Sequence, residues 1–138
     1  ATILLHFDAV FISPNTKIKY PFSELGLAPE VGSSYLLFQA LGYQQAAQLL
    51  FQSKIIDGTK YHELGLAKYV GDDFLDQANS YARDLKEQSL SSIIETKAIL
   101  KLFMLEDLAK ARSMETKAMK KLFGSEDNLK AVEKFFNK

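Results

Sequence analysis

The chain changes character near residue 70, and this change restricts the folds that are open to it. All three prolines and five of the seven glycines lie in residues 1–70. The apolar runs there are short and bounded by turn residues, which is typical of strands and loops. From residue 71 onward, charged side chains are denser and apolar ones recur at helical spacing. We therefore expect an α/β fold whose first part is mixed and whose last part, residues 71–138, is helical.

Residues 1–70 predict short strands separated by turns. Residues 10–12 (VFI) and 17–20 (KIKY) flank a Ser-Pro-Asn-Thr turn, so we expect a strand, a turn and a second strand. A further apolar run at residues 66–70 favours another short strand.

Three helices are expected between these strands. Ser33 and Ser34 are candidate caps of the first. It ends at Gly42, because glycine readily adopts the left-handed conformation that closes a helix. A second helix follows directly over residues 43–52. A third, of one to two turns, comes after an Asp-Gly turn and ends at Gly65.

Helical periodicity dominates the rest of the chain. Residues 74–85 carry an apolar stripe at helical spacing behind two aspartates whose charge complements the helix dipole. Ser92 and Glu95 fit a capping box, in which the two side chains satisfy the first N–H groups of a helix. Apolar residues continue that helix to Gly124, and Ser125 is placed to cap a last amphipathic helix.

One stretch of sequence occurs twice in this helical part. Residues 95–103 (ETKAILKLF) and 115–123 (ETKAMKKLF) are identical at seven of nine positions. Two copies spaced by 20 residues fit no usual helical-repeat period, and lysine-rich amphipathic helices recur easily by composition. We interpret the similarity as coincidental. The alternative, an all-helical scaffold, would leave residues 1–70 without strands.

Composition excludes several classes of function. Lys and Arg number 17, and so do Asp and Glu, so a formal net charge of zero predicts no nucleic-acid partner. The chain has no cysteine, and its two histidines are too far apart to suggest a metal site. We expect His6 to be packed or hydrogen-bonded and His62 to lie on the surface. No apolar run approaches the roughly 20 residues that span a bilayer, so no membrane partner is expected.

The densest motif is residues 20–34 (YPFSELGLAPEVGSS). It places one carboxylate, Glu30, in a Pro/Gly-rich loop directly before an expected helix. A carboxylate at the mouth of an apolar loop can act as a general base, because desolvation favours its neutral form. It can equally be a solvated acid that stabilises the following helix through the helix dipole. The residues alone leave both interpretations open.

Several short motifs follow one another in a recognisable order. They are DAVFI at residues 8–12, the loop at 20–34, LGYQQAAQLL at 41–50, KIID at 54–57 and ELGLA at 63–67. Their order resembles the C-terminal half of the crotonase (enoyl-CoA hydratase/isomerase) superfamily, and within it the Δ3,Δ2-enoyl-CoA isomerases of the peroxisomal and mitochondrial type. The resemblance is continuous over residues 1–70 and looser beyond. It implies that residues 1–70 are the last part of a ββα spiral core, and that residues 71–138 are the helical region through which family members trimerise.

The resemblance also implies a catalytic chemistry. Family hydratases use two glutamates, and the matching positions here are Thr2 and Phe22, which argues against hydration. The isomerase subgroup uses a single glutamate, which matches Glu30, although Val31 stands where the family commonly has a small residue. One glutamate between C2 and C4 of a 3-enoyl-CoA can carry the proton from one carbon to the other. No cofactor is implied, because coenzyme A is part of the substrate.

Five apolar residues are candidates for the lining of the acyl pocket under this resemblance. Apolar side chains on a loop and the helix after it are also common in ordinary cores, so both interpretations remain open. The five residues are Phe22, Leu25, Leu27, Tyr35 and Phe38.

The same resemblance implies partners and a location. In the family, the N–H groups that stabilise the thioester oxygen lie upstream of the matching segment, so we expect a fragment that is inactive without the N-terminal half of its fold. Apolar surface near Val10 and Ile18 would then be exposed. We expect an acyl-CoA substrate, a homotrimer, and the peroxisomal matrix or, alternatively, the mitochondrial matrix. The alternative function is a non-catalytic acyl-CoA-binding or protein-interaction module.

Overall fold

The structure is a computed structural model that describes residues 1–137. It contains one short 3₁₀ helix, two short strands and five α-helices in the described residues. In chain order they are η1 (Thr2–His6), β1 (Phe11–Ile12), α1 (Ser33–Gln52), α2 (Gly58–Glu63), β2 (Tyr69–Val70), α3 (Phe74–Lys86), α4 (Leu90–Leu122) and α5 (Glu126–Phe136).

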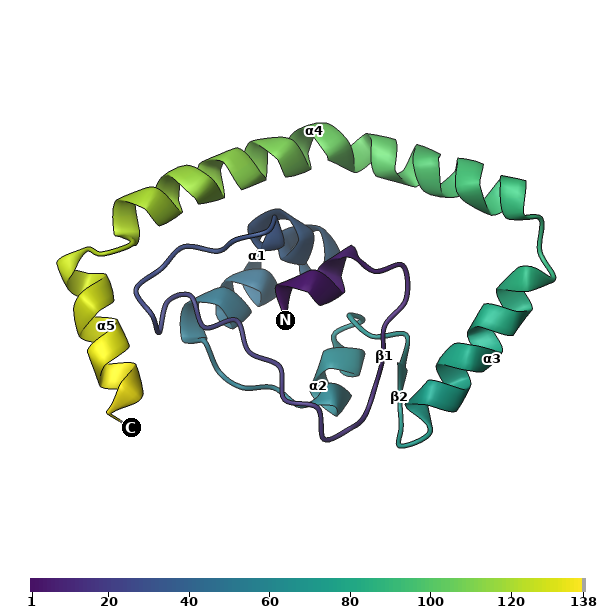
Figure 1. Cartoon of the computed structure of the whole chain (residues 1–138), viewed down its shortest axis with the longest axis horizontal. Helices are drawn as coiled ribbons and strands as arrows, with labels where there is room; N and C mark the ends of the chain where they lie inside the picture. The colour runs from purple at the N-terminus through teal and green to yellow at the C-terminus, as the bar shows by residue number, and fades with distance from the viewer. Residues whose placement is uncertain (138) are drawn as a thin grey trace.

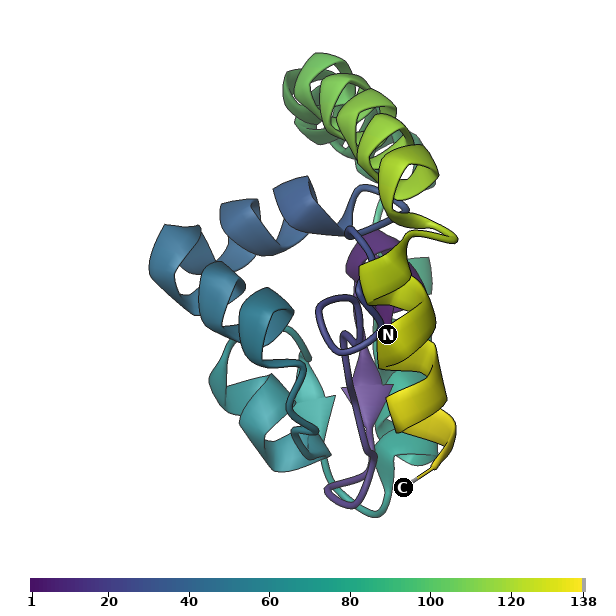
Figure 2. The same ribbon diagram turned by 90° about the vertical axis from the view of Figure 1, so that its left-hand side faces the viewer.

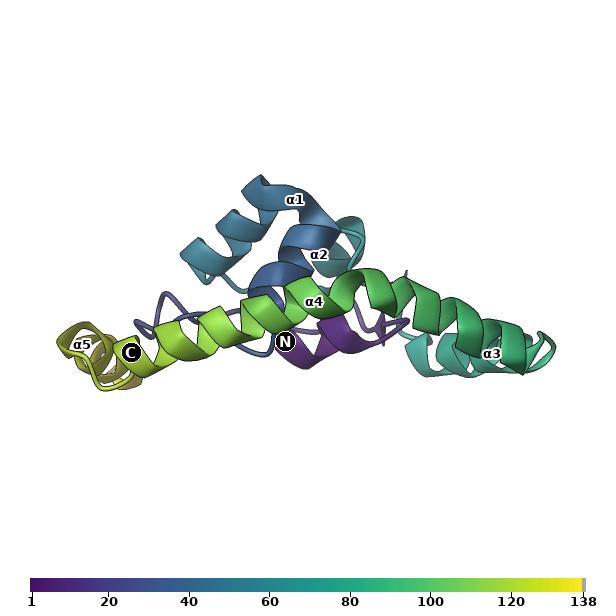
Figure 3. The ribbon, with the colours of Figure 1, turned by 90° about the horizontal axis from the view of Figure 1, so that it is seen from above.

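The last three helices surround the rest of the molecule. Figure 1 shows α3, α4 and α5 passing along three sides of a body formed by η1, α1, α2 and the two strands. In the two perpendicular views, α1 lies to one side of the arch that these helices make (Figures 2 and 3). One end of the arch is fixed by aromatic packing, since the rings of Phe11 on β1 and Tyr81 on α3 are 5.6 Å apart between centroids.

The sheet is small and parallel. Phe11 pairs with Tyr69 and Ile12 with Val70, so the strands predicted at residues 10–12 and 66–70 are confirmed in shortened form. The strand predicted at residues 17–20 is wrong, because only Ile18 makes a bridge there, antiparallel to Ile56.

Backbone hydrogen bonding explains the missing strand. After the turn, the Pro14 carbonyl accepts from the Gly58 N–H at 3.0 Å, and Ile18 exchanges two hydrogen bonds of 2.9 Å with Ile56. The segment therefore pairs with the residues at the start of α2 and just before it, and it does not add a strand to the sheet.

The break predicted at Gly42 is confirmed. Gly42 has φ 73° and ψ 170°, a conformation that interrupts α1 and turns its second half away from its first. Both halves bury apolar side chains, Leu37 in the first and Ala46 in the second. The glycine thus lets one helical stretch cover two sides of the core.

The helices of the last part agree with the predictions except at one start. Residues 74–85 lie in α3, and the Ser125 hydroxyl caps α5 by accepting from the Asn128 N–H at 3.2 Å. The capping box at Ser92 and Glu95 is wrong, because α4 begins earlier. Its cap is Ser89, whose hydroxyl accepts from the N–H of Ser92 at 3.3 Å, so Ser92 lies inside the first turn.

The duplicated stretch lies on a single helix and behaves as a coincidence. Both copies are on α4, and twenty residues at 3.6 per turn rotate equivalent positions by about 200°. The two copies therefore face nearly opposite directions. Glu115 is buried whereas Glu95 is exposed. The all-helical scaffold is wrong as well, since residues 1–70 contain both strands.

The core lies under α1 and around the two strands. Val10 and Ile18 are 8% and 3% exposed, so the expected apolar exposure at these residues is wrong. Burial by α1, α2 and the loop before α1 accounts for the difference, because Leu37, Tyr61 and Phe22 belong to the same cluster. Large exposed apolar side chains occur in both parts of the chain and are more numerous on the helical part, where Phe103 and Phe136 are each 78% exposed.

Two buried tyrosines predict a specific pH dependence of stability. The hydroxyls of Tyr20 and Tyr61 are 3.4 Å apart, and burial raises the pKa of both above the ordinary 10.0. Unfolded tyrosines lose their protons near pH 10 while the folded pair keeps them, so stability is full below pH 10 and falls as pH rises further. The free energy of unfolding then falls by up to about 1.4 kcal/mol per pH unit for each tyrosine.

Urea unfolding between pH 8 and pH 11 measures this slope. Tyr61→Phe is expected to flatten it by removing one of the two buried hydroxyls. Tyr43→Phe, at a tyrosine that is 70% exposed, should leave it unchanged. An identical slope in Tyr61→Phe and the wild type would contradict the assignment.

Candidate active site

The loop before α1 coils back on itself and so gathers its apolar side chains. The Leu25 N–H donates to the Pro21 carbonyl at 3.0 Å, and the Leu27 N–H donates to the Phe22 carbonyl at 2.8 Å. Gly26, with φ 64°, makes the reversal possible. Phe22, Leu25 and Leu27 are thereby brought to one place.

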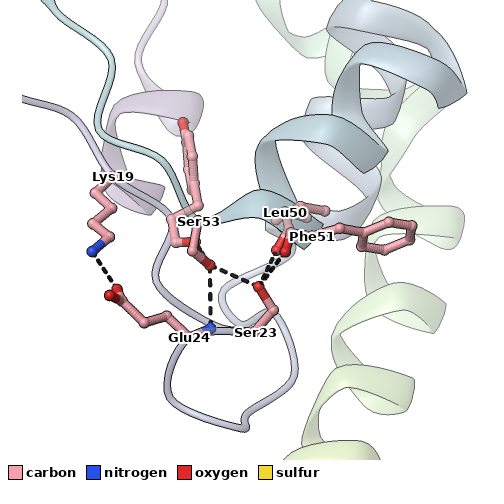
Figure 4. A network of polar contacts seen from close by, with 7 residues as sticks. Lys19, Ser23, Glu24, Leu50, Phe51 and Ser53 are labelled. Carbon is pink, nitrogen blue, oxygen red and sulfur yellow. Dashed lines mark hydrogen bonds and ion pairs between the residues drawn. The ribbon is translucent and has the colours of Figure 1, made fainter. Parts of the chain in front are cut away.

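Two serines attach this loop to the far end of α1 (Figure 4). The Ser23 hydroxyl lies 2.7 Å from the carbonyl oxygen of Phe51, to which it donates, and 2.8 Å from the hydroxyl of Ser53. Ser53 in turn donates to the Tyr20 carbonyl at 3.0 Å and accepts from the Glu24 N–H at 3.3 Å. The unsatisfied carbonyls at the end of α1 thus find a donor, and the start of the loop is fixed.

The helix α5 holds the same loop from the other side. Asn128 is 4% exposed; its side-chain amide donates to the Leu25 carbonyl at 2.6 Å and accepts from the Gly124 N–H at 2.9 Å. A Cβ at Gly26 would lie 2.9 Å from the Asn128 Cα, closer than real contacts allow. Only glycine lets the loop and α5 approach so closely.

A cavity of about 190 Å³ lies against this loop and contains the candidate base. Glu30 lines it together with Phe22, Leu25 and Leu27, and Met119 contributes from the end of α4. Four of the six predicted site residues therefore share one cavity. Phe22 is also part of the buried core, whereas the Glu30 side chain is exposed to solvent.

The two positions that match the hydratase glutamates lie in the same place. Thr2 and Phe22 both line the cavity that contains Glu30. Among the lining residues, Glu30 is the one carboxylate. Lys19 and Tyr20 are the other titratable side chains of the lining, beside apolar residues, so the site as folded offers a single carboxylate.

Tyr35 and Phe38 lie elsewhere, on the first half of α1. Neither lines this cavity, and Phe38 is 47% exposed. They follow the loop in sequence, but the left-handed turn at residues 31–32 directs the helix away from it. Their contribution to an acyl pocket stays a prediction.

The turn directly after Glu30 is held by residues that the sequence did not point to. Val31 and Gly32 have φ values of 58° and 76°. The expected capping of α1 by Ser33 and Ser34 is wrong, since the cap position is Gly32 and neither serine side chain caps the helix. Glu115, which the sequence showed only as part of a duplicated stretch, takes that role from α4. Its carboxylate accepts from the N–H groups of Gly32 at 2.7 Å and Ser34 at 3.0 Å.

The histidines behave as predicted. His6 Nε2 lies 2.8 Å from the Val31 carbonyl oxygen, a hydrogen bond that ties η1 to the same turn. His62 is exposed, and its Nδ1 lies 2.8 Å from the Ala67 carbonyl oxygen.

Residues 1–137 contain neither a cluster of metal-binding side chains nor a helix that could span a membrane. No group of three or more His, Cys, Asp or Glu side chains there could hold a metal ion. Over the same residues, every helix is too short or too polar to cross a bilayer.

Comparison with known proteins agrees with the fold and with the motif order. The family model for enoyl-CoA hydratase/isomerase matches residues 1–138. The structure of Pseudomonas aeruginosa OdaA superposes with a TM-score of 0.91 at 32% identity, covering 99% of this chain and 57% of that one. An enoyl-CoA hydratase/isomerase from Pseudoalteromonas atlantica also gives 0.91, at 26% identity, over 99% and 56%.

Curated relatives match over shorter stretches. The putative enoyl-CoA hydratase/isomerase YhaR of Bacillus subtilis is 28% identical over 115 residues, 82% of this chain and 45% of that protein. Enoyl-CoA delta isomerase 3, peroxisomal, of Mus musculus is 36% identical over 69 residues, 50% of this chain and 22% of that protein. The chain thus spans less than half the length of these relatives.

The solved structures cover the strands, the broken helix α1 and the surrounding helices together. The expected fold, the C-terminal part of a crotonase spiral followed by a helical region, is therefore confirmed. The chain belongs to the enoyl-CoA hydratase/isomerase family, the crotonase superfamily.

Proposed function

We propose that this chain is the part of a Δ3,Δ2-enoyl-CoA isomerase that carries the acid–base residue. The observation that supports this is the cavity in which Glu30 is the one carboxylate among the lining residues, beside Thr2 and Phe22. A hydratase needs a second carboxylate to handle the added water, whereas a double-bond shift needs one group that can both accept and return a proton.

The proposed reaction follows from this single group. Glu30 removes a proton from C2 of a 3-enoyl-CoA, and the electrons of the C–H bond form a C1–C2 double bond while the carbonyl electrons move onto the thioester oxygen, which gives a dienolate. When the carbonyl re-forms, the C1–C2 electrons become the C2–C3 double bond, and the C3–C4 electrons take the proton back from Glu30 at C4. Charge develops on the thioester oxygen during the transfer. Two N–H donors aimed at that oxygen are worth roughly 3–4 kcal/mol each in comparable sites.

These donors and most of the coenzyme A surface are proposed to come from outside the 138 residues. The chain covers 57% of the OdaA structure and 56% of the Pseudoalteromonas atlantica structure, so the proposed enzyme is a longer polypeptide with a complete spiral. We also propose that it is a homotrimer. The peroxisomal delta isomerase relative favours the peroxisomal matrix over the mitochondrial matrix as its location.

Two parallel assays on the full-length protein test the function. Conversion of a 3-enoyl-CoA to the 2-trans-enoyl-CoA is expected to proceed, and hydration of the 2-trans-enoyl-CoA is expected to be at least about 10²-fold slower, because the second acid–base group is missing. The 138-residue chain assayed alone should show neither reaction. Faster hydration than isomerisation would overturn the proposal.

A non-catalytic acyl-CoA-binding or protein-interaction module is the second candidate. Val31 and the exposed position of Glu30 favour it, since a β-branched residue with positive φ follows a carboxylate that is open to solvent. A full-length protein that binds coenzyme A thioesters but turns over neither substrate would establish this alternative.

A further inference from the structure

Glu115 is a buried carboxylate far from Glu30 in sequence but attached to the same turn. It is 6% exposed and lies in the second half of α4. Its Oε2 accepts from the Gly32 N–H at 2.7 Å, and its Oε1 accepts from the Ser34 N–H at 3.0 Å and the Ser34 hydroxyl at 2.6 Å. Three donors and the positive end of the α1 dipole compensate the buried charge.

The helix α4 contacts this turn through several residues of one face, and not only through the hydrogen bonds of Glu115. Leu108, Arg112 and Glu115 are spaced by four and three residues, so they share a face. A Cβ added at Gly32 would overlap the Leu108 side chain and lie 3.5 Å from the Arg112 Cγ. The turn after Glu30 therefore packs directly on α4.

The turn that this face holds is strained. Val31 has φ 58°, a conformation that a β-branched residue rarely adopts and that persists only where the surroundings impose it. On one side, His6 bonds the Val31 carbonyl at 2.8 Å. On the other side, Glu115 holds the next N–H group along the chain, that of Gly32.

We propose that Glu115 is a positioning residue for Glu30. With its bonds in place, the backbone on the C-terminal side of Glu30 is fixed, and the Glu30 side chain lies on the cavity wall. Without them, Val31 is free to relax to an extended φ, which redirects the peptide that carries Glu30. This role rests on the proposed function, because it matters only if Glu30 transfers the proton.

The substitution Glu115→Gln tests this role most directly. Glu115→Gln keeps the size of the side chain but replaces one acceptor oxygen by an NH₂ group, which would then face an N–H donor of the turn. Ser34→Ala removes only the hydroxyl donor and leaves both backbone bonds. Glu95→Gln is the matched control, because Glu95 stands in the same local sequence on the same helix but is exposed. Asp57→Ala, which removes the cap of α2, controls for loss of stability alone.

Steady-state isomerase kinetics on the full-length variants give the expected pattern. Glu115→Gln should lower kcat by about 10–100-fold, as a misplacement of the base by roughly 1 Å does, with KM changed by less than about threefold. Ser34→Ala should lower kcat by less, about threefold. Both controls should keep the wild-type kcat, even though Asp57→Ala lowers the melting temperature. If Glu115→Gln does not fold, Ser34→Ala carries the test.

Combination with Glu30→Gln separates this inference from the proposed function. In that background Glu115→Gln should change kcat by less than about twofold, since a base that is absent cannot be misplaced. A full additional loss in the double variant, or a wild-type kcat in folded Glu115→Gln, overturns the positioning role and leaves the isomerase assignment intact. An unaffected Glu30→Gln variant overturns the assignment of the base itself.

Discussion

Glu30→Gln is expected to lower kcat for the isomerisation of a 3-enoyl-CoA by about 10²-fold or more. The amide has the shape of the carboxylate but can neither take the proton from C2 nor return it to C4, and general acid–base groups typically contribute factors of this size. Binding should be retained, because Phe22, Leu25 and Leu27 still line the cavity.

Kinetics and binding on the full-length protein measure the two parts of this expectation. The dissociation constant of a saturated acyl-CoA should stay within about threefold of wild type, an estimate that follows from the unchanged apolar wall. Glu63→Gln, at an exposed glutamate on α2, is the matched control and should retain full turnover. Unchanged turnover in folded Glu30→Gln would rule out Glu30 as the base.

Gly58→Ala is expected to cost about 2–3 kcal/mol of folding free energy. Alanine normally stabilises a helix relative to glycine, by about 0.5–1 kcal/mol. Here the added Cβ would overlap the backbone carbonyl of Ser13 and lie 3.3 Å from the Ile12 Cδ1. Backbone cannot move aside as a flexible side chain can, so the overlap outweighs the gain.

Urea unfolding of Gly58→Ala and of the wild type measures this loss of folding free energy directly. Thr59→Ala, one position further along α2 and exposed, provides the comparison and should change the unfolding free energy by no more than about 0.5 kcal/mol. Equal or greater stability of Gly58→Ala would mean that the approach of residue 58 to Ser13 is looser than the structure has it.

Features that depend on neighbouring residues were predictable from the sequence. The break at Gly42 and the cap at Ser125 need only local conformation, and both are confirmed. Phe22, Leu25 and Glu30 were also predictable as one group, because a single loop carries them.

Features that depend on distant residues were not predictable. The N-terminus of α1 is capped by a residue 83 positions from Gly32, so the nearby serines were the natural but wrong choice. Residues 17–20 have the composition of a strand, yet Ile18 finds a partner only at Ile56. Nothing in a single sequence indicates such pairings, since they depend on which segments tertiary packing brings together.

The unbroken helix α4 makes the spacing of its residues as important as their identity. It runs for 33 residues, about 50 Å at 1.5 Å per residue. It places Met104 in a cavity that Leu4 and Leu5 of η1 also line, and it places Leu108 and Glu115 against the turn at Gly32. Inserting one residue between Met104 and Glu115 would rotate everything beyond it by about 100° and carry the carboxylate away from Gly32. Length changes can be absorbed only in the connections at residues 87–89 and 123–125. In this part of the molecule, the number of residues between two contacts is constrained as strongly as the side chains that make them.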